Sequence, residues 1–312
     1  MRTMITTTTL AYIISAGVAL AVSLYSLIGT SQEPQPVLVD KSPVTGANVT
    51  PLERAARIAR AGGVDPAYVD MLLADSTTAF DAKYVKSNVT NFASKADYSH
   101  NFSAEAVRSV REFVKQHDST LKAANERFGV PPNVIGALMW VETKHGRITG
   151  KHHVPSVYMS VLLCSEPEFV ESNTQIVLKA KNLDSTRHDS VFASIEKRAQ
   201  RKVNWATSQL KALATIQKNK TMNTLALYGS WAGAFGYTQF LPSSYLSWAA
   251  DGTNDGLIDL YQFDDAIYSV ANYLATNGWG PTDAEQRKAV HHYNNSDDYV
   301  NAVLKLAKMS SE

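Results

Sequence analysis

The spacing of apolar residues between positions 128 and 146 is the feature that most constrains the fold. Val134, Ile135, Leu138 and Val141 recur at helical intervals and form one apolar face. Two prolines precede this face where a helix can begin, and a glycine follows it where a helix can end. No stretch alternates strictly between apolar and polar residues for long enough to build a substantial sheet. The chain is therefore predicted to be mostly α-helical.

Glu142 is the one acidic residue on this apolar face, four residues after Leu138 and seven after Ile135. An apolar setting disfavours the charged form of a carboxyl group, which raises its pKa towards the range useful to a general acid. The alternative is a glutamate near a helix C-terminus that is half exposed or paired with Lys144 or Arg147. The pattern of this helix alone leaves both interpretations open.

Composition limits the classes of protein that the chain can belong to. Hydrophobic residues make up 45% and charged residues 19% of the 312 positions, which is typical of a globular protein. The formal net charge of +1 gives no large basic footprint, so we do not expect nucleic acid as a partner. Cys164 is the single cysteine, which excludes an internal disulfide framework, and we expect it to be packed as a small apolar residue.

The N-terminal region indicates export. Residues 3–32 carry no charge, and residues 10–28 are predominantly apolar and nearly long enough to cross a bilayer as a helix. Arg2 precedes this run, which favours placing the rest of the chain outside the cytoplasm. A small-x-small site at residues 19–21 favours a cleavable signal peptide instead. We therefore predict a signal anchor or signal peptide over residues 1–31, followed by a proline-rich linker over 32–51.

Helices are predicted along much of the remaining chain. A stripe from Leu52 ends at two glycines, and Asp65 is expected to cap a second helix that starts at Pro66. A polar loop of about 25 residues should follow, and then a helix over 103–128. Residues 194–217 also have helical spacing and carry several lysines and arginines. These basic residues form either a solvated helix face or the wall of a groove for an anionic polymer.

Residues 228–245 alternate small residues with aromatic ones and end in a proline-serine turn. Glycines let the backbone approach a ligand closely, and aromatic rings offer flat surfaces on which sugars stack. The alternative is a tight aromatic core around a bend in the chain. This stretch alone favours neither interpretation.

Residues 251–259 match the start of an EF-hand calcium loop. Oxygen-bearing side chains occupy loop positions 1, 3, 5 and 9, with glycine at position 6 and an apolar residue at position 8. Position 12 is Gln262 instead of the usual glutamate, but Asp264 and Asp265 follow closely and could close the site. The alternative is a surface turn that binds nothing. Calcium would be structural, because the loop leads into an apolar helix, and the adjacent His291 and His292 do not indicate a catalytic metal.

Together, these stretches resemble the membrane-bound lytic murein transglycosylase B family (glycoside hydrolase family 103). The resemblance runs from about Leu52 to the C-terminus, and the matching motifs are residues 128–132, 141–147, 233–245, 251–259, 265–267, 270–273 and 293–294. It differs at Lys144 and His145, where the family usually has an arginine and an aromatic residue. The segment 152–222 also looks longer than in the family and diverges widely.

The resemblance implies a lysozyme-like α-helical core, over about 121–165 and 222–312, with flanking helical subdomains inside a catalytic domain 52–312. It implies that Glu142 is the single catalytic acid/base. The implied substrate-binding residues are Ser230, Gln239, Tyr273, Tyr293 and Asn294. The implied calcium ligands are Asp251, Thr253, Asp255, the carbonyl of Leu257, and Asp265, which would replace the missing carboxylate at position 262.

The activity implied is that of a peptidoglycan lytic transglycosylase, which cleaves the bond between N-acetylmuramic acid and N-acetylglucosamine and leaves a 1,6-anhydro end. The alternatives are a lysozyme-type hydrolase and a non-catalytic peptidoglycan-binding scaffold. The expected partners are glycan strands, the membrane through the N-terminal segment, and cell-wall synthesis proteins. The expected location is the periplasm or cell envelope.

Overall fold

The computed structural model describes residues 49–91 and 97–312. The predicted signal segment 1–31 and most of the predicted linker lie outside the described residues. Within the described ranges, no helix combines the length and the apolar character that crossing a bilayer requires.

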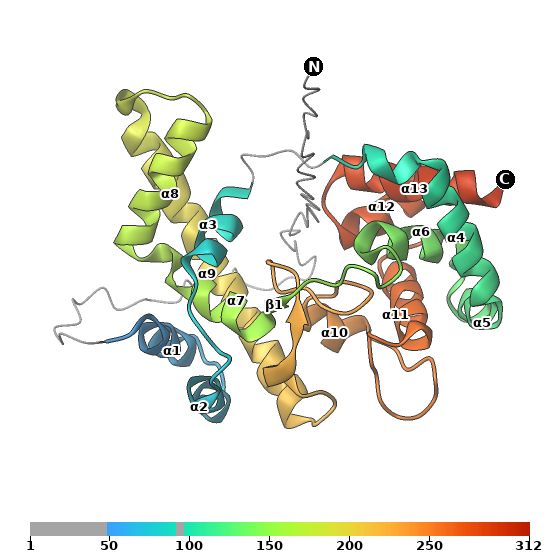
Figure 1. The fold of residues 1–312 in the computed structure, drawn as a ribbon, viewed down its shortest axis with the longest axis horizontal. Coiled ribbons are helices and arrows are strands. Elements are labelled where there is room, and N and C mark those ends of the chain that lie inside the picture. The colour runs from blue at the N-terminus through green and yellow to red at the C-terminus, as the bar shows by residue number, and fades with distance from the viewer. Residues whose placement is uncertain (1–48, 92–96) are drawn as a thin grey trace, which may run out of the picture.

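The helices form two lobes, which lie to the left and right of a central connection in Figure 1. The first lobe contains α1 (Pro51–Ala61), α2 (Pro66–Ala74), α3 (Ala82–Thr90), α7 (Val154–Val161), α8 (Pro167–Ala180) and α9 (His188–Lys218). The second lobe contains α4 (Ala104–Gln116), α5 (Asp118–Phe128), α6 (Pro132–Thr143), α11 (Phe263–Thr276), α12 (Asp283–Tyr293) and α13 (Asp297–Ser311). Between them lie β1 (His152–His153), β2 (Tyr228–Gly229) and α10 (Pro242–Trp248). Short 3-10 helices are η2 (Ser99–Phe102), η3 (Leu162–Ser165), η4 (Ser185–Arg187) and η5 (Thr224–Ala226).

The predicted mostly helical architecture is confirmed, and the cap expected at Asp65 is present. The Asp65 side chain accepts the N–H of Ala67 at the start of α2, with Pro66 in the first position. Ser103 caps α4 in the same way, through the N–H of Ala106. The two-stranded sheet is the only one in the described residues, in line with the missing alternation in the sequence.

Three helix predictions need correction. The loop expected after α2 contains α3, which Asp81 caps and which packs on α7 and α8 through its buried face. The helix expected over 103–128 breaks at His117, because α4 packs on α6 and α13 whereas α5 packs mainly on α11. The helix with Glu142 ends at Thr143, before the glycine, since the backbone at Lys144 turns left-handed with φ 52°.

Helix α6 is the centre of the second lobe. It packs most extensively on α13 and α4, with further contacts to α5 and α11. Of the predicted apolar face, Val134, Ile135 and Leu138 are buried and Val141 is half-buried. Met139 and Trp140 are buried as well, so α6 is covered on more than the predicted face. The division into a core 121–165 and 222–312 stays a prediction; in the packing, α4 joins this lobe and α7 joins the other.

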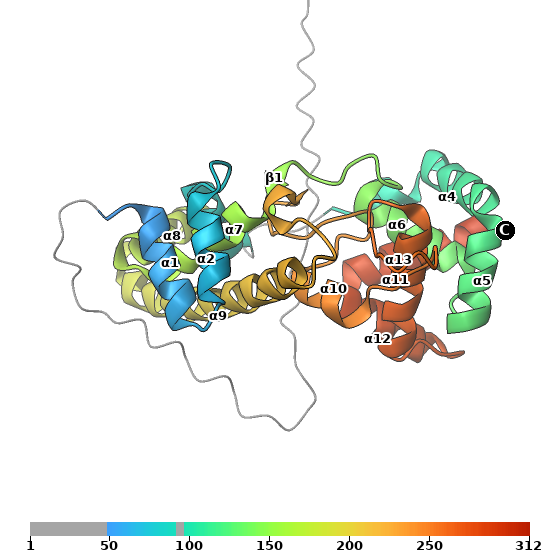
Figure 2. The same cartoon turned by 90° about the horizontal axis from the view of Figure 1, so that it is seen from below.

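Helix α9 runs from the first lobe towards α10, where the chain returns to the second lobe (Figure 2). The two strands pair antiparallel nearby, with His152 opposite Gly229 and His153 opposite Tyr228. This small sheet joins the segment that enters the first lobe before α7 to the segment that leaves it after α9.

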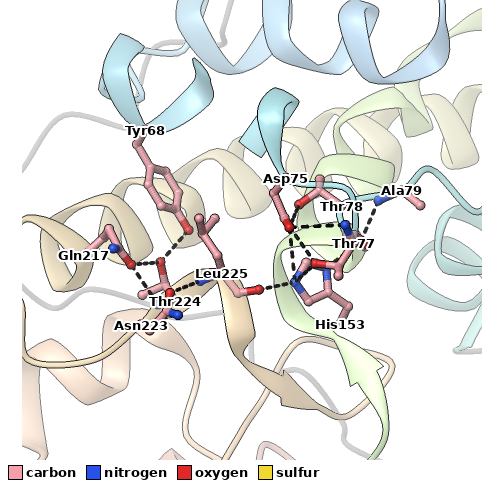
Figure 3. A network of polar contacts seen from close by, with 11 residues as sticks. Tyr68, Asp75, Thr77, Thr78, Ala79, His153, Gln217, Asn223, Thr224 and Leu225 are labelled. Carbon is pink, nitrogen blue, oxygen red and sulfur yellow. Dashed lines mark hydrogen bonds and ion pairs between the residues drawn. The ribbon is translucent and has the colours of Figure 1, made fainter. Parts of the chain in front are cut away.

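A buried polar network holds this crossing in place (Figure 3). The Nε2 atom of His153 donates to the carbonyl of Leu225 at 2.8 Å, and its Nδ1 atom lies 2.7 Å from the hydroxyl of Ser156. That hydroxyl also accepts the N–H of Ala79, and the carboxylate of Asp75 lies 4.0 Å from Nε2. The loop after α2 is thereby tied to the segments that enter both strands.

Gly150 lies just before β1 in a left-handed conformation, with φ 91°. An added Cβ would lie 2.1 Å from the carbonyl oxygen of Gly229. Gly278 has nearly the same φ, 89°, but open space around it. We expect Gly278→Ala to cost about 1 kcal/mol through backbone strain alone, and Gly150→Ala to cost ~1–3 kcal/mol more through the steric clash. Urea unfolding of both variants measures this, and equal losses would contradict the close approach.

Candidate active site

Glu142 lies in the last turn of α6 and is only 5% exposed. The hydroxyl of Tyr299, on α13, donates a hydrogen bond of 2.5 Å to its Oε1 atom. The structure therefore confirms an acid within an apolar setting and excludes the half-exposed alternative.

The electrostatics of Glu142 follow from this burial. Loss of hydration raises the pKa of its carboxyl from 4.5 to about 7. The hydrogen bond from Tyr299 and the positive charge of Lys144 both act in the opposite direction. A carboxyl with a pKa near neutrality can donate a proton and later accept one, which is what acid/base chemistry requires.

Tyr299, in α13, is a site residue that the sequence did not identify, because its partner lies far away along the chain. The ring of Tyr98 packs edge-on against it, with 5.9 Å between the ring centroids. Burial raises the pKa of Tyr299, and the charge of Glu142 raises it further, so its hydroxyl stays a donor. The signal that could have found Tyr299 is general: a buried tyrosine hydroxyl needs a polar partner.

Three of the predicted groove residues lie together, next to the tyrosines Tyr98 and Tyr299 that surround the acid. The rings of Tyr273 and Tyr293 lie 4.6 Å apart, and the hydroxyl of Tyr293 donates to the carbonyl of Thr238 at 2.6 Å. Asn294 is 3% exposed, and its side chain forms a hydrogen bond with Tyr98. Its Oδ1 atom is buried and has no hydrogen-bond partner within residues 49–91 and 97–312. A shielded amide oxygen of this kind is commonly satisfied by an ordered water.

The other two predicted groove residues shape the loop between β2 and α10. The hydroxyl of Ser230 accepts the N–H groups of two residues in its own turn. Gln239 has φ 51°, and its side-chain amide donates to the carbonyls of Thr149 and Gly236. The loop reaches the acid's helix where Thr143 donates to the carbonyl of Tyr237 at 3.0 Å. A role for Ser230 and Gln239 in binding substrate stays a prediction.

The core interpretation of the aromatic stretch is confirmed in part, and the sugar-binding interpretation stays a prediction. Phe235, Phe240 and Tyr245 are buried and form a core around the bend. Tyr228, by contrast, is 46% exposed. Glycines are needed in this loop, since an added Cβ on Gly233 would lie 2.4 Å from the ring of Tyr158.

The predicted calcium loop places two of its aspartates on either side of Thr253. The hydroxyl of Thr253 donates to Asp251, and its N–H donates to Asp265. Asp265 is 1% exposed and accepts further N–H groups from Gly252 and Asp259. No cluster of three or more His, Cys, Asp or Glu side chains in the described chain has metal-binding geometry.

This loop also borders a pocket of about 390 Å³. Asp255, Leu257 and Asp265 line one side, and residues 221–223 and 226–227 line the other. The oxygen-only donor set of the loop is the kind that calcium prefers.

The basic residues of α9 differ in their exposure to solvent. Lys197, Arg201 and Lys211 are exposed, as a solvated face requires. Lys202 is buried, with its Nζ atom 4.3 Å from the ring centroid of Trp205. Burial lowers the pKa of Lys202 to about 8. The solvated-face interpretation is therefore wrong for Lys202. Cys164 is free and buried, as expected.

The raised pKa of Glu142 predicts a pH dependence of stability. Its folded pKa is above its unfolded value, so the protonated form stabilises the fold below about pH 4.5, and this stability is lost as pH rises through about 7. The shift corresponds to about 3 kcal/mol. We expect Glu142→Gln to gain that amount relative to wild type between pH 4.5 and pH 8, measured by urea unfolding. The exposed Glu126→Gln on α5 is the control, and an equal pH response of all three proteins would contradict the buried carboxyl.

Comparison with known proteins identifies a matching family and a relative of the chain. The model of the transglycosylase SLT domain family matches residues 48–290. Membrane-bound lytic murein transglycosylase B of Escherichia coli (strain K12) is 31% identical over 167 residues, which are 54% of this chain and 37% of that protein. The match therefore spans little more than a third of the curated relative.

Solved structures share the fold. An Escherichia coli lytic transglycosylase in complex with calcium has a TM-score of 0.58 and 20% identity, and the alignment covers 85% of this chain and 94% of that one. SltB3 from Pseudomonas aeruginosa in complex with NAG-anhNAM-pentapeptide has a TM-score of 0.61 and 20% identity, covering 83% and 78%. These similarities confirm the expected lysozyme-like helical fold class. Because the family model matches most of the sequence, the chain belongs to the transglycosylase SLT domain family.

Proposed function

We propose that the protein is a peptidoglycan lytic transglycosylase, which cleaves the MurNAc-β-1,4-GlcNAc bond and leaves a 1,6-anhydro-MurNAc end. The observation that carries the proposal is the buried Glu142, whose pKa is raised to about 7 and whose carboxyl is oriented by Tyr299. Membership of the transglycosylase SLT domain family supports the same substrate class. So do the murein transglycosylase relative and the related structure in complex with NAG-anhNAM-pentapeptide.

A single acid favours this reaction over ordinary hydrolysis. Hydrolases usually employ two carboxyl groups, about 5–5.5 Å apart in retaining enzymes and 6.5–9.5 Å apart in inverting ones. The charge that acts on the pKa of Glu142 is the ammonium of Lys144. Asp298 is another carboxyl group in this region, since it and Glu142 both raise the pKa of Tyr98, but Asp298 is exposed. We assign the acid and the base role to Glu142, because its carboxyl is buried and bonded to Tyr299.

The chemistry follows from that assignment. Protonated Glu142 donates to the glycosidic oxygen as the bond to the muramic C1 atom breaks. The carbonyl of the substrate's 2-acetamido group stabilises the cation that develops at C1. Glu142, now ionised, removes the proton from the muramic C6 hydroxyl, which attacks C1 and closes the 1,6-anhydro ring. No water enters the product, and the enzyme returns to its starting protonation state.

The groove residues have matching parts in this proposal. Tyr293 and Asn294 orient the 2-acetamido group. Ser230, Gln239 and Tyr273 complete the glycan-binding groove. The scaffold alternative leaves the buried acid unexplained, because binding alone does not require a carboxyl group that is costly to ionise.

We also propose a structural calcium ion held by Asp251, Thr253, Asp255, the carbonyl of Leu257, and Asp265. The support is the oxygen donor set, the position of Thr253 between two of the aspartates, and the calcium in one structure of similar fold. The ion would hold the loop against α11 and supply no step of the reaction.

The cell envelope is the proposed location. An N-terminal anchor or signal peptide over residues 1–31 and a linker over 32–51 would place the catalytic domain 52–312 beside the peptidoglycan. The Escherichia coli relative is described as membrane-bound, which supports this location. Glycan strands are the proposed substrate, and cell-wall synthesis proteins are candidate partners.

The reaction is tested by digestion of purified peptidoglycan and mass spectrometry of the muropeptides. We expect 1,6-anhydro products from wild type and a loss of at least about 10³-fold in rate for Glu142→Gln, since an amide cannot transfer the proton. Products heavier by one water would identify a hydrolase instead. Retained binding to cell walls without any turnover by wild type would identify a scaffold, and an active Glu142→Gln would remove the assigned role.

Calcium is tested by thermal unfolding. We expect calcium at 100 times its Kd to stabilise wild type by about 2.7 kcal/mol over the chelated protein. Asp251→Asn should lose this response, while Asp283→Asn, an exposed aspartate in the first turn of α12, should keep it. The same unfolding temperature for wild type with calcium and with a chelator would refute the metal loop.

A further inference from the structure

The end of helix α6, next to Glu142, has an unusual backbone. Lys144 and His145 follow each other with φ 52° and 54°, in the left-handed region that residues other than glycine rarely adopt. The N–H of Lys144 closes the helix by bonding to the carbonyl of Trp140. Such a conformation costs free energy, so it persists where the surroundings fix it.

The side chain of Lys144 points to a reason for this conformation. Its Nζ atom donates a hydrogen bond of 2.6 Å to Oδ1 of Asn101 and lies 4.8 Å from the ring centroid of Trp140. Asn101 is 1% exposed, and its amide nitrogen donates to the carbonyl of Tyr98. The ammonium group is therefore held by η2 on one side and by α6 on the other.

This arrangement connects Lys144 to the acid in two ways. Tyr98 packs on Tyr299, and Tyr299 donates to Glu142. The hydrogen bond from Lys144 to Asn101, which clamps η2 to the end of α6, therefore also supports the hydrogen bond to the carboxyl. The ammonium and the carboxyl also belong to residues only two positions apart, and each charge stabilises the other.

We propose that Lys144 is a positioning residue for Glu142: it clamps η2 beside the acid and supplies the positive charge that stabilises the carboxylate after proton donation. This inference rests on the proposed function for its catalytic meaning. The charge interaction itself is a property of the folded chain and can be measured without substrate.

Other charged groups face this pair from the elements packed around it. Glu105 of α4 raises the pKa of Lys144, which burial otherwise lowers to about 8. Lys144 in turn lowers the pKa of His100 on η2. Tyr299 and Tyr98 face Glu142 from α13 and from the start of η2, and burial and the charge of Glu142 raise the pKa of both hydroxyls. The charge of Asp298 on α13 also raises the pKa of Tyr98.

Lysine and arginine should differ at this position. The family that the sequence resembles usually has an arginine here. An arginine stays charged at every working pH, whereas the half-buried Lys144 loses its proton above about pH 8. The clamp and the charge can therefore be separated by substitution. Lys144→Arg keeps the charge and a donor for Asn101, and Lys144→Met removes both.

The first readout is the titration of the Glu142 carboxyl by carbon-13 NMR, with Glu142→Gln used to assign the signal. We expect the pKa of Glu142 to rise by about one unit or more in Lys144→Met, because a favourable charge is lost, and to stay at the wild-type value below pH 8 in Lys144→Arg. Arg147→Met is the matched control, since Arg147 is an exposed cation near the same helix end and also faces Trp140.

The second readout is the pH dependence of kcat/KM for peptidoglycan digestion. The alkaline limb should move to higher pH with the carboxyl titration in Lys144→Met, and the plateau rate should fall at least about fivefold because the carboxylate is less stabilised. Lys144→Arg should keep the plateau rate, and Arg147→Met should leave the limb in place.

The outcomes separate the two proposals. A carboxyl titration that is the same in wild type and Lys144→Met would overturn the role of Lys144, even if Lys144→Met lowered the unfolding temperature. A shifted titration in a protein that never digests peptidoglycan would support the charge interaction and reject the proposed function.

Discussion

Burial of the Glu142 carboxyl at the end of α6 is the constraint on which the rest of the site depends. A carboxylate in that position lacks hydration, and the fold compensates with one hydrogen bond from Tyr299 and one nearby ammonium from Lys144. The tyrosine comes from α13, and the lysine, at the end of α6, is held by Asn101 of η2. The packing of α13 and η2 therefore determines the protonation behaviour of the acid as much as α6 does.

The second lobe explains how this environment is built. Helix α6 lies between α4 and α13, so its apolar residues are covered on two sides and the acid is sealed at one end. Tyr98, Tyr293 and Asn294 then gather around Tyr299 from the adjoining η2 and the end of α12. Several chain segments must pack together before Glu142 acquires its raised pKa and its hydrogen bond.

The connection between the lobes serves the site in a different way. The β1–β2 pair, the polar network around His153 and the loop 230–241 bring the first lobe against the helix of the acid through Thr143. Ser230 and Gln239 use their polar groups to shape that loop. Their proposed contact with a glycan therefore depends on a scaffold that they themselves help to fix.

The sequence by itself determined the helical class, the cap at Asp65, the apolar face of α6 and the presence of an acid on it, because periodicity and capping are local properties. It missed α3 and the break at His117, since those boundaries depend on which helices lie nearby. Tyr299 and the burial of Lys202 were decided only by the tertiary structure. The hydroxyl that orients Glu142 comes from a residue 157 positions away, and no local pattern encodes a contact of that range.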